Sequence, residues 1–116
     1  MIYFTYKANE NVLANHFVQL ANDENSVEIN TTKQTIGLCR SVYVSEDDGL
    51  RYAEIYQAGG GGQLAVLNAE WSGAPCRFDV INSKVQPVAS GGLGWIIPEF
   101  PKTTKSAGDS VYISIY

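Results

Sequence analysis

The chain has 116 residues and a formal net charge of −4, and its eight Lys and Arg residues are scattered along the sequence. Scattered cations do not follow a phosphate backbone, and no apolar run reaches the ~20 residues of a membrane span, so we expect no nucleic acid and no membrane among its partners. The N-terminus lacks a basic segment followed by an apolar one, which predicts no signal peptide and synthesis in a cytoplasm.

The first residues alternate in the manner of a strand. Ile2, Phe4 and Tyr6 would share one face of it. Because this segment lies far in sequence from the strand-rich half, we predict an N-terminal arm over residues 1–10 and a single β-rich domain over residues 11–116. The arm would be an edge strand whose unpaired amides await a neighbouring chain.

The segment Asn11–Asn22 changes to a different period. Its apolar residues and its single histidine recur at steps of three and four, which is the spacing of one helix face, so we predict a short helix here. These residues are Val12, Leu13, His16, Phe17 and Leu20. The polar stretch that follows contains one short predicted strand at Val27–Ile29.

From Thr35 onward, short apolar alternations are separated by turn residues. The predicted strands are Ile36–Val44, Arg51–Tyr56, Leu64–Leu67, Cys76–Ile81 and Val111–Tyr116, and the predicted turns are Asp47–Gly49, Gly59–Gly62, Asn82–Ser83 and Gly91–Gly92. This pattern predicts a mainly β fold, a small antiparallel β-sandwich or β-barrel-like domain with one short helix near the N-terminus. No transparent repeat is visible.

Few residues suit catalysis or metal binding. His16 is the only histidine, and the glycines of Gly59–Gly62 lack the Lys-Ser/Thr pair of a phosphate-binding loop. The acidic turn Glu46–Gly49 lacks the spaced ligands of a calcium loop. We therefore predict no enzyme, no cofactor and no metal, and we expect Cys39 and Cys76 to be reduced thiols.

The aromatic residues point to binding instead. Seven Tyr and two Trp occur with little charge, and these side chains combine apolar area with a polar tip that suits protein interfaces and sugar stacking. We expect several tyrosines, including Tyr56, on outward strand faces. The candidate interface residues are Ile2, Tyr3, Phe4, Tyr6, Trp71, Trp95, Tyr112 and Tyr116.

The order of segments over residues 35–116 resembles the head decoration, or cement, proteins of tailed bacteriophages. The resemblance lies in a glycine-containing strand opening, an acidic hairpin, a Gly-rich tip, a Gly-Ala-Pro step before a strand, and a closing Ala-Gly-Asp step before an alternating strand. These segments are Ile36–Leu38, Gln63–Asn68, Trp71–Pro75, Arg77–Val80, Lys84–Val88, Gly94–Pro98 and Ala107–Ile115.

The resemblance implies a structural protein on the capsid surface of a virion. Its partners would be the major capsid protein and further copies of itself, as a trimer or dimer. Two other readings stay open: a carbohydrate-binding β-domain that uses Trp71, Trp95 or surface tyrosines, and a small hydrolase, which a single histidine makes difficult to build.

Overall fold

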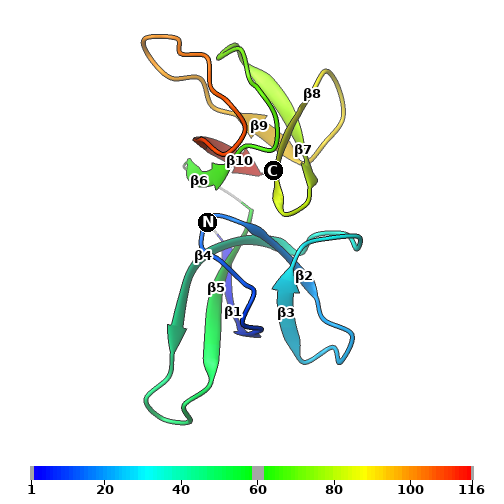
Figure 1. The fold of residues 1–116 in the computed structure, drawn as a ribbon, viewed down its shortest axis with the longest axis vertical. Coiled ribbons are helices and arrows are strands. Elements are labelled where there is room, and N and C mark those ends of the chain that lie inside the picture. Colours follow the sequence, from blue (N-terminus) through cyan, green and yellow to red (C-terminus); the bar gives the residue numbers. More distant parts are fainter. Residues whose placement is uncertain (1, 59–61, 116) are drawn as a thin grey trace.

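The computed structural model describes residues 2–58 and 62–115, and these residues form ten strands and no helix. The strands fall into two groups that lie one above the other in Figure 1, which we call the first lobe and the second lobe. The first lobe contains β1 (Ile2–Ala8), β2 (Phe17–Leu20), β3 (Ser26–Ile29), β4 (Gly37–Val44) and β5 (Arg51–Ala58). The second lobe contains β6 (Gln63–Val66), β7 (Cys76–Ile81), β8 (Lys84–Val88), β9 (Gly94–Ile96) and β10 (Ser110–Ile115).

The first lobe is a closed barrel with the strand order β1-β3-β2-β4-β5. β1 closes it, because this strand pairs in parallel with β3 and antiparallel with β5. The pairing with β5 extends from Ile2 to Lys7, whereas the pairing with β3 involves Lys7 and Ala8 at the end of the strand. This placement differs from the expected arm, whose unpaired amides would await another chain.

The interior of the first lobe is small and aliphatic. Residues from four strands and one loop fill it, and all of them are fully buried. They are Val12, Val18, Val27, Cys39, Ala53 and Ile55. The β4–β5 hairpin continues past this core and ends in the acidic turn that the sequence predicts.

The second lobe is a five-stranded sheet with the order β6-β10-β9-β7-β8. Its two edges approach each other at a parallel bridge between Leu67 and Val85, where the amide of Asn68 donates to the carbonyl of Val85 at 2.7 Å. The β7–β8 turn consists of Asn82 and Ser83, which both have positive φ, as a two-residue hairpin turn requires. The predicted strand Cys76–Ile81 and this turn are confirmed.

The two lobes share a hydrophobic core. Phe17, Leu38 and Tyr56 belong to the first lobe but are buried in one cluster with the interior of the second lobe. The Phe17 amide donates to the Ser83 carbonyl at 2.8 Å, and its ring lies 6.1 Å from that of Phe78. Tyr56 thus points out of its barrel, as expected, but the second lobe covers it completely.

The predicted helix over Asn11–Asn22 is wrong. Its apolar residues do not share a face: Val12 fills the first barrel, Leu13 is 51% exposed, and Phe17 begins β2 and points into the contact between the lobes. Asn15 adopts a φ of 67°, which a right-handed helix cannot accommodate. The three- and four-residue spacing therefore arises from a loop with separate anchors. The mainly β prediction is confirmed, including a strand at Val27–Ile29.

Candidate functional site

Of the predicted interface residues, Trp71 belongs to a core and Tyr6 packs against one. Trp71 is only 3% exposed, packs in the core of the second lobe, and donates from Nε1 to the Ala74 carbonyl at 2.9 Å. Tyr6 is half-buried against the interior of the first barrel. Trp71 therefore presents no ring face to a partner or to a sugar.

The predicted residues of β1 lie in different surroundings. Tyr3 is half-buried, and its phenol oxygen accepts a hydrogen bond from Arg40 Nη1 at 2.8 Å, while the guanidinium lies 5.1 Å from the ring centroid. The Tyr3 ring also contacts that of Tyr56 at 5.8 Å, so it supports the contact between the lobes. Phe4 is 48% exposed. Tyr116 and the side chain of Ile2 lie outside the described residues.

Trp95 and Tyr112 lie together on the outer side of the second lobe. Strand register places Ser114 opposite Trp95, and the amide of Ile97 donates to the carbonyl of Tyr112 at 2.9 Å, so the two aromatic residues are diagonal neighbours. Trp95 is 43% exposed and Tyr112 is 48% exposed. We call this surface the aromatic face. It consists of Leu64, Arg77, Val88, Trp95, Ile97, Tyr112 and Ser114.

Arg77 is the positive charge of the aromatic face. It lies opposite Trp95 in the β7–β9 register, and its guanidinium lies 5.3 Å from the Trp95 ring centroid. Its Nε donates to the carbonyl of Gly91. The cation is thus held over an exposed indole.

A second exposed apolar surface lies at the far end of the first lobe, and sequence reasoning missed it. The β4–β5 hairpin carries Tyr43, Val44 and Leu50, which are 48%, 65% and 43% exposed. The Tyr43 ring stacks on the Tyr52 ring, with 5.9 Å between their centroids. We call residues 43–52 the hairpin end. In the sequence, this surface is indicated by two tyrosines, one on each side of an acidic turn.

The acidic turn of the hairpin end is held in shape by its own side chains. The Tyr52 hydroxyl donates to Asp48 Oδ2, and the Leu50 amide donates to Asp48 Oδ1 at 2.9 Å. These hydrogen bonds lower the pKa of the Asp48 carboxyl, and the same contact raises the pKa of Tyr52. Glu46 and Asp47 add two exposed carboxylates beside it.

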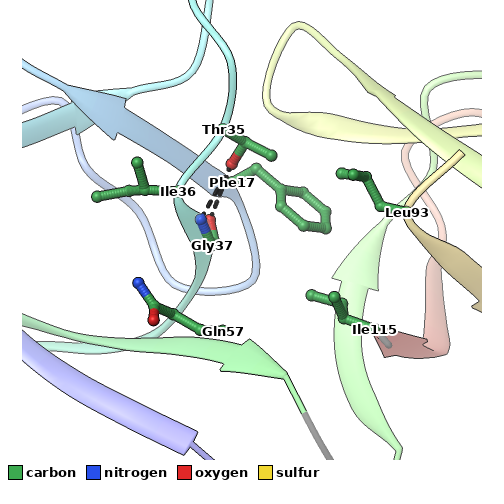
Figure 2. A pocket seen from close by; sticks show the side chains of 7 residues that line it. All are labelled: Phe17, Thr35, Ile36, Gly37, Gln57, Leu93 and Ile115. Atoms are coloured by element: carbon green, nitrogen blue, oxygen red, sulfur yellow. Dashed lines mark hydrogen bonds between the residues drawn. The ribbon is translucent and has the colours of Figure 1, made fainter.

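A cleft of about 200 Å³ opens between the lobes. Figure 2 shows it between Ile36 and Gln57 of the first lobe and Leu93 and Ile115 of the second, with Phe17 on one side. Pockets for drug-sized ligands begin at about 300 Å³. The cleft is smaller than that and mostly apolar, so we assign it no ligand.

Among the described residues, no three His, Cys, Asp or Glu side chains are grouped as a metal site would need. His16 contacts the Ala14 carbonyl through Nδ1 at 3.0 Å, a local loop contact. Burial raises the pKa of the Cys39 thiol to about 11. Within the same described part of the chain, no helix is long and apolar enough to cross a membrane.

The aromatic face and the hairpin end are thus two surfaces on which exposed aromatic side chains lie close together. They lie on different lobes, and each carries exposed aromatic rings. A scan of protein-family models, a search of curated proteins and a search of solved structures found no match to this chain.

Proposed function

We propose that this chain is a structural capsid decoration (cement) protein, which binds the outer surface of an assembled phage head and stabilises it. Its partners are the major capsid protein and further copies of itself, as a trimer or dimer. The resemblance of residues 35–116 to cement proteins motivates the proposal. In this proposal, the protein lies on the capsid surface of the virion.

One structural observation carries the proposal: the molecule is an elongated pair of lobes with a separate exposed aromatic surface on each. The Cα extents are 45 × 26 × 23 Å, and the hairpin end projects from the lobe that does not carry the aromatic face. The shared core of Phe17, Leu38 and Tyr56 joins the lobes. Such a body can contact two neighbours at once, and many copies on one head multiply weak contacts into firm retention.

The proposal is tested by co-sedimentation with undecorated phage heads. We expect the unmodified protein to sediment with heads and to raise the temperature at which the heads release their DNA. A Trp95→Ala/Tyr112→Ala variant and a Tyr43→Ala/Leu50→Ala variant should each be retained at least tenfold less. Phe100→Ala is the matched control, because this exposed aromatic side chain belongs to neither surface. Unmodified protein that leaves heads unbound would refute the proposal.

Carbohydrate binding is the second candidate, and the exposed Trp95 favours it. An indole on an open sheet face beside Tyr112 and Ser114 offers a stacking platform with polar neighbours. A glycan array separates the two functions. Binding of one glycan class that disappears in Trp95→Ala, without binding to heads, would establish the carbohydrate reading.

A further inference from the structure

The two lobes have the same strand connectivity. In each, the first strand pairs antiparallel with the fifth, the fifth with the fourth, the fourth with the second, and the second with the third. In each, the first and third strands meet in parallel, at Ala8–Val27 in the first lobe and Leu67–Val85 in the second. The chain therefore repeats one five-stranded unit, and we call this repeat the duplication.

Individual backbone contacts repeat at matching positions. The amide of the asparagine after the first strand donates to the third strand in both lobes, from Asn9 at 2.9 Å and from Asn68 at 2.7 Å. The fourth strand begins with a glycine in both, Gly37 and Gly94. A Cβ on either glycine would meet a carbonyl oxygen of the fifth strand, at 2.6 Å for Gly37 and 1.9 Å for Gly94.

This correspondence matches two outer rows of side chains. In the first lobe, Phe17, Leu38 and Tyr56 are neighbours across the second, fourth and fifth strands. The equivalent row in the second lobe is Arg77, Trp95 and Ser114, at the centre of the aromatic face. The first row packs on the interior cluster of the second lobe, whereas Trp95 in the second row is 43% exposed.

The comparison of the lobes singles out the hairpin end as an addition to the shared unit. In the second lobe the fourth strand, β9, has only three residues. In the first lobe β4 has eight residues and stays paired with β5 as far as Val44 and Arg51, so that the hairpin extends away from the second lobe (Figure 1). Within the described part of the second lobe, no paired hairpin corresponds to this extension.

The apolar side chains of the hairpin end contribute to neither core. Tyr43, Val44 and Leu50 are all exposed, and among the described residues none of the three packs against either core cluster. Tyr43 stacks on Tyr52 instead. Neighbouring exposed apolar side chains on an element that the fold does not need are typical of a binding surface.

Hydrogen bonds within the turn fix the shape of this surface. The Gly49 amide donates to the Ser45 carbonyl and the Ser45 amide donates to the Leu50 carbonyl, both at 2.9 Å. The Asp48 carboxylate accepts from the Tyr52 hydroxyl and from the Leu50 amide. A surface that is ordered before it binds loses little conformational entropy on binding, so the hairpin end can dock without refolding.

The tip of the hairpin end is negatively charged. Three carboxylates and one guanidinium give residues 43–52 a formal net charge of −2. The carboxylates of Glu46 and Asp47 are exposed, and neither forms a salt bridge with a described residue. Their charge is therefore available to a cation of a partner.

Two cations lie beside the hairpin end. The Arg51 guanidinium donates to the carbonyls of Glu10 and Val12, at 3.0 and 2.6 Å, and so holds the loop that precedes β2. Lys7 of β1 lies opposite Tyr52 in the strand register. Neither forms a salt bridge with the carboxylates of the tip, which leaves the tip acidic.

We propose that the hairpin end docks in an apolar groove with a basic rim on a partner protein. Tyr43, Val44 and Leu50 supply the apolar contact, while Glu46 and Asp47 meet Lys or Arg side chains at the rim. The same negative charge repels nucleic acid and anionic lipid, so the partner is a protein. The inference rests on the proposed function, in which this partner is the major capsid protein, and it names the chemistry of the surface that the capsid offers.

Co-sedimentation with undecorated phage heads over a series of salt concentrations tests the charged half of the contact. Retention of the unmodified protein should fall as the NaCl concentration rises from about 0.05 to about 0.5 M. A Glu46→Gln/Asp47→Asn variant should be retained about tenfold less at low salt and should depend little on salt. Glu24→Gln/Glu70→Gln is the matched control, because it removes the same charge from exposed residues of other elements and should bind normally.

The apolar half of the contact is tested in the same assay. Val44→Ser should lower retention at every salt concentration, because the side chain is 65% exposed in the free protein and becomes buried in the groove. Leu13→Ser is its matched control, since Leu13 is 51% exposed on a loop of the same lobe. Circular dichroism of each variant verifies its fold before the comparison.

The outcomes separate this inference from the proposed function. If unmodified protein binds heads and the Glu46→Gln/Asp47→Asn variant binds as well or better, the inference is overturned and the proposed function stands. An equal loss in the Glu24→Gln/Glu70→Gln control also overturns it, because net charge rather than the hairpin end then governs retention. Unmodified protein that leaves heads unbound refutes the proposed function and the inference with it.

Discussion

The two lobes use one strand connectivity for different surroundings. In the first lobe, the outer row of Phe17, Leu38 and Tyr56 is apolar and covered, while in the second lobe the equivalent row contains Arg77 and Ser114 and is open. The exposed row is thus more polar, and its aromatic residue, Trp95, occupies the position that Leu38 has in the covered row. The position of a row in the fold thus determines where a contact can form. The side chains of that row determine whether the contact is a permanently buried one.

The interiors of the two lobes differ as well. Equivalent interior positions exchange large and small side chains, so each interior is filled by different residues. The equivalent pairs are Tyr6 and Ala65, Ala8 and Leu67, and Val18 and Phe78. The second lobe thereby places Phe78 where the first has Val18.

The largest effect should come from removing β1, which tests whether the first lobe is a closed barrel. We expect deletion of residues 1–8 to abolish cooperative unfolding of the first lobe. The deletion breaks ladders to both β3 and β5, at about 1 kcal/mol per hydrogen bond, and opens the barrel interior to water. Such losses are comparable to the roughly 5–15 kcal/mol that stabilises a typical domain.

Amide hydrogen exchange of the truncated chain measures this, with Phe4→Ser as the control that keeps β1 but reduces its exposed apolar area. A truncated chain that keeps slow exchange in β4 and β5 would show that the strand is dispensable. In that case the segment would act as the arm that the sequence suggested.

The matched glycines provide the next largest effect and test the duplication directly. We expect Gly94→Ala to destabilise the protein by about 3 kcal/mol, at the upper end of overpacking costs, because its Cβ would meet the Ser114 carbonyl oxygen at 1.9 Å. Gly37→Ala should behave similarly against Tyr56. Gly91→Ala, with open space around it and a φ of +72°, should lose only about 1–2 kcal/mol through backbone strain. Urea unfolding gives all three values, and equal losses would contradict the close contacts.

Local patterns in the sequence were sufficient for most strands. Cys76–Ile81 and the Asn82–Ser83 turn carry alternation and turn chemistry that tertiary contacts do not override. The prediction of a helix over residues 11–22 was wrong because spacing gives only the distance along the chain. In the structure, Val12 and Phe17 pack into two different cores.

The duplication escaped sequence reasoning because equivalent positions preserve burial rather than residue type. Val18 corresponds to Phe78 and Phe17 to Arg77, so the two halves share few letters. The aromatic face was predicted in part, through Trp95 and Tyr112. The hairpin end was not, since its exposure depends on how far β4 and β5 extend past the barrel core.

The two cysteines should differ in reactivity according to their lobes. Cys39 is fully buried in the first barrel, and burial raises the pKa of its thiol to about 11, whereas Cys76 is half-buried at the start of β7. We expect iodoacetamide at pH 8 to modify Cys76 at least tenfold faster than Cys39 in the folded protein. Intact-mass spectrometry follows the labelling, and equal rates in urea provide the control. Faster labelling of Cys39 would contradict its burial.

The smallest expected effect is an acid dependence that belongs to the hairpin end alone. Because the pKa of the Asp48 carboxyl lies below its ordinary value of 3.8, its contribution to stability is present above that pH and lost as pH falls through the lowered pKa. Tyr52→Phe removes the main hydrogen bond that lowers this pKa. The variant should therefore lose less stability than the unmodified protein as the pH falls from about 4 to about 2. Thermal unfolding across this range checks it. Identical pH profiles would show that the Tyr52 hydrogen bond does not cause the acid dependence.

The most direct test of the account compares the matched pair Leu38→Ala and Trp95→Ala by urea unfolding. These residues occupy equivalent positions in the two lobes, but Leu38 is 1% exposed and Trp95 is 43% exposed. The account predicts a loss of about 2–5 kcal/mol for Leu38→Ala and less than about 1 kcal/mol for Trp95→Ala in dilute protein. Equal losses, or a larger loss at Trp95, would contradict the claim that one row is permanently covered and the other is open.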